Sequence, residues 1–380
     1  MLDFAYNLFS ALPDYVKAGA VKLINFFFKI RLRLVRTPLF IIFFVTGRCN
    51  ANCRHCFYRP ALNRRQQEIT LPQAEKIAVS LKNRTSLLLT GGEPFLRDDL
   101  LQICRAFYCR GKTKDIRIAT NGFFTDKIIS TARDILKDNK ARLTLQVSVD
   151  AIGDVHEALR QLKGAYLKAM ETIAGLKRLA LSFPRLRISV VSVVTEYNYH
   201  ELAKLAAHLK DNFSLNLGLI FIRDDGAGVY NLVPQLRCDI PLLPEAFKLP
   251  ARDKIEALIS RINRLSEGSP RSFKENFSQL EKKYELDIIF DAKRPPVRCL
   301  APKTDLVIYP DGKTAFCEIV KPFADLKEFG YDISKLWNSQ EAKETRKKNI
   351  DCFCAHPCHL ISSMRNNART LLDLGKFPVR

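Results

Sequence analysis

Residues 39–56 read LFIIFFVTGRCNANCRHC and hold the two features that decide the fold. Residues 39–46 are almost all apolar, rich in aromatic and β-branched side chains, and predict a buried strand. Residues 47–56 are a polar loop that carries Cys49, Cys53 and Cys56. Because parallel sheets carry their chemistry at the carboxyl ends of their strands, this loop is where we expect a functional site.

The same strand pattern recurs along the chain with helical patterns between the strands. The predicted strands are residues 39–46, 86–90, 115–120, 142–150, 187–194 and 216–221. The predicted helices are residues 71–81, 98–108, 126–138, 165–179 and 199–212. Short strands that are apolar on both faces are typical of a parallel sheet covered by helices. The alternation therefore predicts a right-handed wound α/β sheet, open or partly closed.

The chain of 380 residues is long enough for two or three domains. We divide it into a basic amphipathic N-terminal segment (1–38), the strand–helix core (39–222), a helical connector (223–298) and a small C-terminal domain (299–380). The connector holds helical patterns at 252–265 and 272–284. In the last domain, residues 305–309 and 313–316 flank Pro310-Asp311-Gly312 and predict a β-hairpin.

Composition excludes several classes of protein. With 47% hydrophobic and 27% charged residues, the chain is neither wholly disordered nor a polytopic membrane protein. The net charge of +21 favours an acidic partner, which is a nucleic acid, an anionic membrane surface or an anionic substrate. The basic residues are dispersed and no RNA-binding or helix-turn-helix motif is visible, so we expect no nucleic acid partner.

The N-terminal segment predicts a helix with one apolar stripe. The stripe and a basic stripe about 120° away are spaced at helical period. The apolar stripe is Val16, Ala20, Leu23, Phe27, Ile30 and Leu34, and the basic one is Lys22, Lys29, Arg33 and Arg36. Such a helix either packs on the body of the protein or makes peripheral contact with a membrane surface.

The eleven cysteines predict metal binding rather than disulfides. They cluster at 49/53/56 and 352/354/358, and no cleavable signal peptide is visible. We therefore expect a reducing, cytoplasmic location, with membrane association as the alternative. Thiolates select zinc or iron–sulfur centres. A zinc site in the first loop would need His55 as fourth ligand, beside Cys56, so three thiolates with one open metal position fit the loop better.

The Cys49-x3-Cys53-x2-Cys56 loop resembles the signature of the radical S-adenosylmethionine (SAM) superfamily. The resemblance implies a partial (β/α)6 TIM-like barrel over residues 39–222. It also implies a [4Fe–4S] cluster held by these three thiolates, with SAM on the open iron. A low-potential electron donor of the flavodoxin or ferredoxin type is then the expected partner.

Further motifs extend the resemblance. Thr90-Gly91-Gly92-Glu93 resembles the family segment that lines the SAM amine, and paired glycines let backbone carbonyls approach a cation closely. By the family's Ser-x-Asp and His-Asp-x-x-Arg series, Ser148 is expected near the SAM ribose and Arg160 on the SAM carboxylate. Two positions depart from the family pattern, with Ala151 and Gln161 where Gly is usual.

Residues 120–122, Thr-Asn-Gly, have two readings. They also resemble the family, and they equally fit an ordinary turn closed by Gly122.

The C-terminal domain carries a second cysteine pattern. Cys299-x12-Gly312-x4-Cys317 is followed by Cys352-x-Cys354-x3-Cys358, which resembles the auxiliary cluster domains called SPASM or twitch. Five cysteines cannot fill two four-thiolate clusters, so we expect one auxiliary [4Fe–4S] cluster and one spare or unusual cysteine. A zinc site is the alternative, because four of these thiolates also suit a tetrahedron.

The remaining cysteines, Cys104, Cys109 and Cys238, fit neither group. We predict that Cys104 and Cys109 are small core residues of a helix.

The sequence therefore predicts a radical SAM enzyme that cleaves SAM reductively and abstracts hydrogen from a substrate. The substrate is a small metabolite, a lipid-linked molecule or a peptide, and no catalytic acid or base is assigned. The alternative is a protein stabilised by zinc or an iron–sulfur cluster that binds nucleic acid or membrane without radical chemistry.

Overall fold

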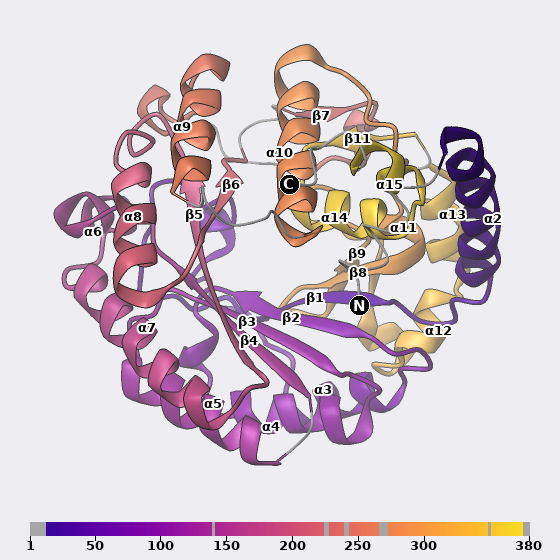
Figure 1. Cartoon of the computed structure of the whole chain (residues 1–380). Helices are drawn as coiled ribbons and strands as arrows, with labels where there is room; N and C mark the ends of the chain where they lie inside the picture. Colours follow the sequence, from indigo (N-terminus) through magenta and orange to yellow (C-terminus); the bar gives the residue numbers. More distant parts are fainter. Residues whose placement is uncertain are drawn as a thin grey trace.

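The computed structural model describes residues 13–138, 141–223, 228–238, 243–265, 273–348 and 351–374. Its centre is a curved sheet covered on its outer side by helices (Figure 1). The first six strands are β1 (Phe40–Thr46), β2 (Ser86–Gly91), β3 (Asp115–Thr120), β4 (Arg142–Ser148), β5 (Leu186–Val194) and β6 (Leu217–Phe221). All six strands predicted from the sequence are confirmed.

The six strands pair in chain order, each parallel to the next. The outer layer consists of α3 (Leu71–Val79), α4 (Leu100–Arg105), α5 (Thr125–Asp138), α7 (Ala165–Ser182) and α8 (Leu202–Phe213). These match the five predicted helices, and α6 (Gly153–Arg160) is an additional short helix after β4. This is the predicted partial (β/α)6 arrangement.

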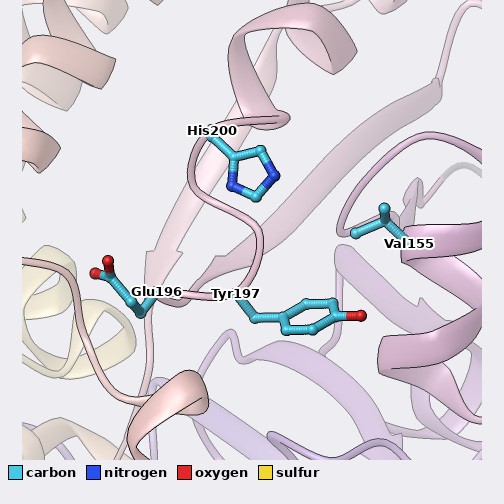
Figure 2. A pocket seen from close by; sticks show the side chains of 4 residues that line it. All are labelled: Val155, Glu196, Tyr197 and His200. Atoms are coloured by element: carbon cyan, nitrogen blue, oxygen red, sulfur yellow. The ribbon is translucent and has the colours of Figure 1, made fainter.

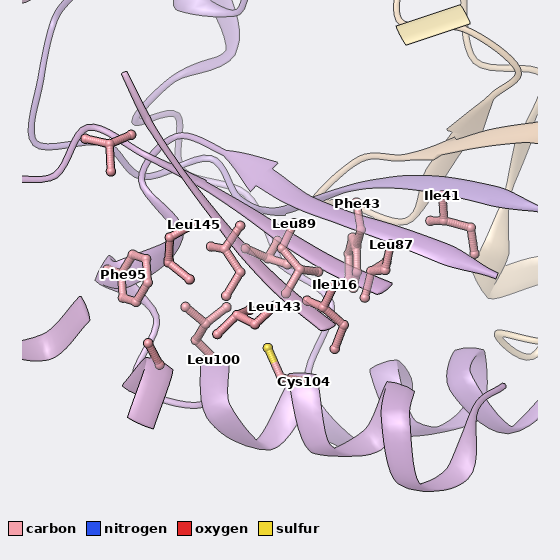
Figure 3. Packing of buried hydrophobic residues seen from close by; sticks show 14 of the residues in the cluster. Ile41, Phe43, Leu87, Leu89, Phe95, Leu100, Cys104, Ile116, Leu143 and Leu145 are labelled. Carbon is pink, nitrogen blue, oxygen red and sulfur yellow. The ribbon is translucent and has the colours of Figure 1, made fainter. Parts of the chain in front are cut away.

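The main core lies between this sheet and the helices. Ile41, Phe43, Leu87 and Leu89 point from the strands toward Leu100 of α4 (Figure 3). Alternate residues such as Ile42 and Phe44 belong to a separate cluster on the inner face of the sheet. Because side chains alternate along a strand, each strand of the barrel fills both layers, which explains why its sequence is nearly all apolar.

The two helical cysteines have different surroundings. Cys104 is fully buried against the sheet, as predicted. Cys109 is exposed, so its prediction as a core residue is wrong. It lies in a π-helical turn, Ala106–Arg110, that follows α4. A π turn shifts the helical register, so the spacing that places Cys104 on the buried face does not hold at Cys109.

The C-terminal region adds strands to the same sheet. The predicted hairpin is present as β8 (Asp305–Ile308) and β9 (Lys313–Ala315), followed by β10 (Ala324–Asp325). Strand β8 pairs parallel with β1, from Phe40 opposite Asp305 to Phe43 opposite Ile308. Among the described strands the order is thus β10-β9-β8-β1-β2-β3-β4-β5-β6. The sequence-based boundary at residue 299 therefore separates strands that lie in one sheet.

The remaining elements belong to the N-terminal helix, the connector and the C-terminal region (Figure 1). Strands β7 (Val229–Tyr230) and β11 (Phe353–Cys354) form a small antiparallel sheet. The remaining helices are α2 (Asp14–Arg33), α9 (Arg252–Arg264), α10 (Phe273–Asp291), α11 (Ala301–Thr304), α12 (Ile333–Trp337), α13 (Gln340–Lys348), α14 (Pro357–Arg365) and α15 (Arg369–Leu374). No helix in the described ranges has the length and apolar character needed to cross a bilayer.

Candidate active site

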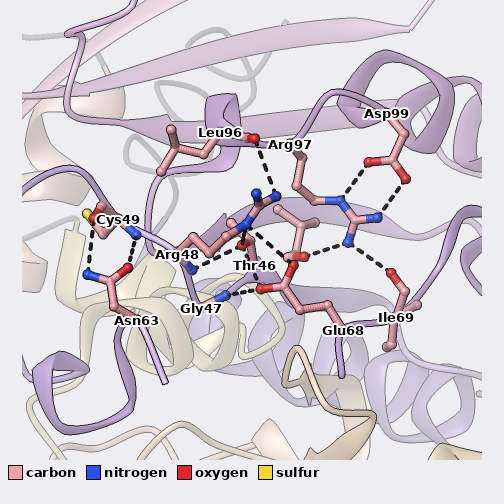
Figure 4. A network of polar contacts seen from close by, with 11 residues as sticks. Thr46, Gly47, Arg48, Cys49, Asn63, Glu68, Ile69, Leu96, Arg97 and Asp99 are labelled. Carbon is pink, nitrogen blue, oxygen red and sulfur yellow. Dashed lines mark hydrogen bonds and ion pairs between the residues drawn. The ribbon is translucent and has the colours of Figure 1, made fainter. Parts of the chain in front are cut away.

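The cysteine loop leaves the carboxyl end of β1 and is fixed by polar contacts on both sides (Figure 4). The Glu68 carboxylate accepts hydrogen bonds from Thr46 Oγ1 (2.7 Å) and Gly47 N (2.8 Å). Asn63 Oδ1 accepts from Cys49 N (2.9 Å), and its Nδ2 donates to the carbonyl oxygen of Cys49 (3.2 Å). These contacts hold the loop through its backbone and use none of its three thiols.

Arg97 fixes the strand end from which the loop departs. Its Nη1 donates to the carbonyl oxygens of Val45 (2.8 Å) and Ile69 (2.9 Å), and Asp99 pairs with the guanidinium (2.6 Å) (Figure 4). A buried cation that satisfies two carbonyl oxygens and an acid holds this end of the barrel in one geometry.

Gly91 and Gly92 let the ends of β1 and β2 approach closely. A Cβ atom on Gly92 would lie 2.0 Å from the carbonyl oxygen of Arg48, and one on Gly91 would lie 2.3 Å from that of Thr46. Gly91 also has a φ of 131°, which a side chain would disfavour. The two glycines are thus required for the shape of the cysteine loop itself.

Glu93 is buried and joins the ends of β2 and β3. Its carboxylate accepts from Thr120 Oγ1 (2.8 Å), Asn121 N (2.8 Å) and Phe95 N (3.2 Å). Burial raises the pKa of Glu93 to about 7, although these donors act in the opposite direction. Thr120 and Asn121 therefore bind the carboxylate of Glu93, and Gly122 closes a turn with a φ of 78°.

Arg160 lies between a buried acid and the second cysteine. Its Nη2 is 2.7 Å from Asp150 Oδ2, and its Nη1 donates to Cys53 Sγ (3.8 Å). His55 Nε2 also approaches Asp150 Oδ2 (3.3 Å). Although burial acts to raise it, Arg160 and His55 lower the pKa of Asp150 to about 2. A buried cation beside a thiol favours the thiolate form that binds metals.

Burial keeps the loop thiols protonated in the protein alone. It raises the pKa of Cys49 to about 12 and that of Cys56 to about 11, and it also raises the pKa of Cys53. A cationic centre that binds all three must therefore displace their protons, which is the normal coupling between metal binding and thiol ionisation.

The spacing of the thiols bears on the choice of metal. A zinc ion with bonds of about 2.3 Å to sulfur brings its tetrahedral ligands within about 4 Å of one another. In the described part of the chain no three cysteine thiols lie within 4.8 Å of one another. Three thiols spread over one loop and an unpartnered Arg160 Nε suit a larger centre.

The C-terminal cysteines divide into two groups. Four of them influence one another electrostatically or by hydrogen bonding, namely Cys299, Cys317, Cys352 and Cys354. The hydrogen bond from Cys299 lowers the pKa of Cys352 to about 7. Burial raises the pKa of Cys358 to about 11, and the charged groups around this thiol are Glu318, Arg223, His359 and Arg117.

Cys358, Glu318 and His356 form a compact mixed group. One ligand atom from each lies within 4.8 Å of the others. Glu318 Oε2 is 3.0 Å from His356 Nε2, and Glu318 Oε1 is 3.3 Å from Arg223 Nη1. The Cζ atom of Arg223 in turn lies 4.3 Å from the ring centroid of Phe57. Phe57 directly follows the cysteine loop. This group thus connects the C-terminal region with the first cysteine site.

Cys238 is a residue that the sequence pattern does not reveal. Its thiol donates to the carbonyl oxygen of Glu318 (3.2 Å), and its backbone N–H donates to that of Ile319 (2.9 Å). It therefore lies beside Cys317, although about 80 residues separate them. Sequence positions also do not reveal that His55 and Arg160 both approach the same oxygen of Asp150.

A hollow of about 450 Å³ opens at the carboxyl end of β5. It is lined by Val155, Glu196, Tyr197 and His200, whose side chains are drawn in Figure 2. Val155 belongs to α6, the helix that carries Arg160. The hollow and the cysteine site therefore both involve α6, but none of the thiols lines the hollow.

This fold and site define a radical SAM domain, since residues 43–209 match the model of the radical SAM superfamily. This part of the chain is therefore a radical SAM domain, as its motifs predict. A radical SAM domain implies a [4Fe–4S] cluster and SAM as cofactors, and the chemistry of the three thiols and of Arg160 fits both.

Curated relatives share mainly this part of the chain. The pre-heme d1 synthase of Dinoroseobacter shibae is 31% identical over 170 residues, 43% of this chain and 39% of that protein. The subtilosin biosynthesis protein AlbA of Bacillus subtilis is 27% identical over 50% of this chain and 41% of that protein. A probable GTP 3′,8-cyclase of Methanothermobacter marburgensis is 28% identical over 72% of this chain and 82% of that protein. The chain spans only 39% to 52% of the first four curated relatives.

Solved structures confirm the fold over a longer stretch. Streptococcus suis SuiB bound to S-adenosylmethionine has a TM-score of 0.56 at 15% identity and covers 84% of this chain and 70% of its own. The structure of anSMEcpe with bound AdoMet and the Cp18Cys peptide also has a TM-score of 0.56, at 14% identity. The match covers 88% of this chain and 98% of that one. The predicted partial barrel with a cysteine-rich C-terminal region is therefore confirmed. The alternative of a binding protein without radical chemistry finds no support in these comparisons.

Proposed function

We propose that this protein is an enzyme that uses SAM to start a radical reaction on an anionic substrate held inside the barrel. Cys49, Cys53 and Cys56 hold a [4Fe–4S] cluster with one iron open to SAM. Bound and reduced, this pair would supply a 5′-deoxyadenosyl radical that removes a hydrogen atom from the substrate. The observation that carries the proposal is the three-thiol loop at the end of β1, seated on Gly92 and facing Arg160.

The surrounding residues orient and shield the site. Backbone carbonyls near Thr90, Gly91 and Gly92 would receive the SAM amine, with the buried carboxyl group of Glu93 behind them. Ser148, on the inner face of β4, lies toward the ribose. The Nη2 atom of Arg160 pairs with Asp150. The SAM carboxylate would therefore bind the edge of the guanidinium that carries Nε, which has no partner.

Aromatic rings close the barrel next to the cysteine loop. Phe44 packs on Tyr58 and Tyr309 with ring centroids 4.7 and 5.3 Å apart. This apolar wall excludes water and other hydrogen donors from the site.

We assign the auxiliary cluster to Cys299, Cys317, Cys352 and Cys354. The mutual influence of their thiols supports this set, and Cys358 then remains as the fifth, spare cysteine. An electron donor of the flavodoxin or ferredoxin type completes the proposed system.

The inner face of the barrel favours an anionic substrate. Arg117, Thr144 and Arg187 are adjacent residues on β3, β4 and β5. Ile116, Ile118 and Leu186 pack into the helix-facing core, so alternation turns both arginines to the interior, where they remain exposed. Two cations flanking a hydroxyl suit a phosphate or carboxylate group. The relatives named above act on unlike molecules, so the anionic group is the only feature of the substrate that we propose.

The decisive experiment reconstitutes the full chain without oxygen and measures 5′-deoxyadenosine from SAM under a strong reductant. We expect the wild-type protein to bind iron and release 5′-deoxyadenosine, and Cys53→Ala to do neither at the first site. Cys109→Ala is the matched control, because this exposed thiol lies outside the site and its loss should change nothing. Persistent 5′-deoxyadenosine release from Cys53→Ala would refute the proposal.

The substrate class is tested separately with pyrophosphate as an anionic probe. We expect it to raise the melting temperature of the wild-type protein and not that of Arg117→Gln/Arg187→Gln. If both proteins respond alike, the anionic substrate is wrong while the radical chemistry stands.

A further inference from the structure

Helix α2 packs on the protein through only one of its faces. Val21 is buried, and Asn25 Oδ1 accepts a hydrogen bond from the backbone N–H of Ala368, just before α15 (2.9 Å). Phe28, Leu32 and Val35 follow on the same side and are half-buried. The predicted helix is thus confirmed, but the stripe of Leu23 and Phe27 is not the face that packs.

A second apolar face of α2 points away from the protein. Leu23, Phe26, Phe27, Ile30 and Leu34 are 58%, 57%, 58%, 38% and 68% exposed. At 3.6 residues per turn these five side chains share a sector about 100° wide. Together with Tyr15 they account for six of the thirteen exposed large hydrophobic residues in the described ranges. Isolated exposed apolar residues are ordinary, whereas such a concentration on one helix marks a contact surface.

Cations border this apolar sector on both sides. Lys22, Lys29 and Arg33 lie along one border and Arg31 along the other, and residues 15–34 contain no acidic residue. No ion pair neutralises these four cations within the described part of the chain, where α2 is visible at the edge of the molecule (Figure 1). Exposed apolar residues flanked by Lys and Arg are the pattern of helices that lie in a membrane interface.

We propose that this face of α2 binds the surface of a membrane rich in anionic lipids, with the five apolar side chains in the acyl boundary and the cations at the headgroups. Charge favours a lipid surface over a second copy of this chain, because pairing two such faces would bring their basic borders together. The helix lies in the interface and does not cross it, in keeping with the lack of a spanning helix in the described ranges. The inference does not depend on the proposed radical chemistry.

Flotation of the full-length holoprotein with vesicles tests this surface. We expect binding to vesicles of 70% phosphatidylcholine and 30% phosphatidylglycerol, and much weaker binding to phosphatidylcholine alone. Leu23→Ser/Phe27→Ser/Ile30→Ser should lower binding more than tenfold. Lys29→Gln/Arg33→Gln should lower it about fivefold per charge and reduce its salt dependence, since each cation near an anionic surface contributes about 1 kcal/mol.

Leu181→Ser is the control, because Leu181 is an apolar residue of α7 that is 85% exposed. This variant should bind vesicles as the wild type does. Circular dichroism verifies that every variant is folded. Equal flotation of the wild type and the triple serine variant would overturn the proposal. The proposal would also be overturned if the wild type is a dimer that binds no vesicles and the triple serine variant is a monomer. In that case the occupant of this face is a second copy of the chain.

Discussion

Asp150 and Arg160 form a buried ion pair beside the thiol of Cys53, with 2.7 Å between Oδ2 and Nη2. The acid follows β4, and the arginine is the last residue of α6. Backbone N–H groups of Asn52 and Arg54 donate to the carbonyl oxygens of Arg160 and Leu159, so the end of α6 is also tied to the cysteine loop. The pair therefore determines where that loop lies.

Asp150→Asn should destabilise the protein strongly, because it leaves the buried Arg160 cation without its counter-charge. Breaking a buried pair typically costs about 3–5 kcal/mol. We expect a clear fall in the urea midpoint of the protein without cluster. Asp115→Asn is the control, since its pair with Arg142 is largely exposed and contributes about 0–1 kcal/mol. Equal midpoints for the two variants would contradict the structural role of Asp150.

Gly92→Ala should abolish iron binding at the first site while leaving the rest of the fold intact. The added Cβ would meet the Arg48 carbonyl at 2.0 Å and Cys49 Cβ at 3.1 Å, so the cysteine loop must move. Iron content and far-ultraviolet circular dichroism are the measurements. Gly19→Ala provides the matched control, because nothing lies within 4 Å of the added atom there. Full iron loading of Gly92→Ala would show that the loop tolerates the shift.

Cys354→Ser and Cys358→Ser should differ in iron content. We expect Cys354→Ser to lose about half of the iron, that is, one of two [4Fe–4S] clusters, and Cys358→Ser to lose none. Iron analysis and electron paramagnetic resonance of the reconstituted proteins distinguish the two. If Cys358→Ser also loses half of its iron, Cys358 is a cluster ligand and our assignment is wrong.

Glu93 should make stability fall as pH rises toward neutrality. Its pKa is raised from 4.5 to about 7 by burial, so the folded protein binds this proton more tightly than the unfolded chain. The resulting stabilisation is complete below about 4.5 and is lost as pH rises through about 7, a change of about 3 kcal/mol. Unfolding of the protein without cluster at pH 5 to 8 should show this slope in the wild type and not in Glu93→Gln. Parallel profiles would exclude Glu93 as the source.

The sequence was sufficient for the barrel and for its cysteine loop. Six apolar strand patterns and five helical ones have the right period and length, and each strand falls where predicted. Three cysteines directly after a strand, with a glycine pair after the next, place a site at one end of a parallel sheet without any knowledge of side-chain orientation.

Other features depend on orientation, which spacing alone does not give. Residues 150, 55 and 160 meet around one carboxylate because β4, α6 and the loop converge in space. The apolar stripe of α2 was recognised, but which face of that helix would be covered depends on its contact with α15. Cys109 was misplaced because a π turn changes the helical period by one residue.

The pairing of β8 with β1 has a consequence for any attempt to dissect the molecule. Residues 305–308 supply the backbone partners of residues 40–43, the strand that leads into the cysteine loop. A truncated chain that stops before residue 299 would expose an unsatisfied strand edge of the kind that drives aggregation. The barrel and the C-terminal region should therefore be expressed and purified as one chain.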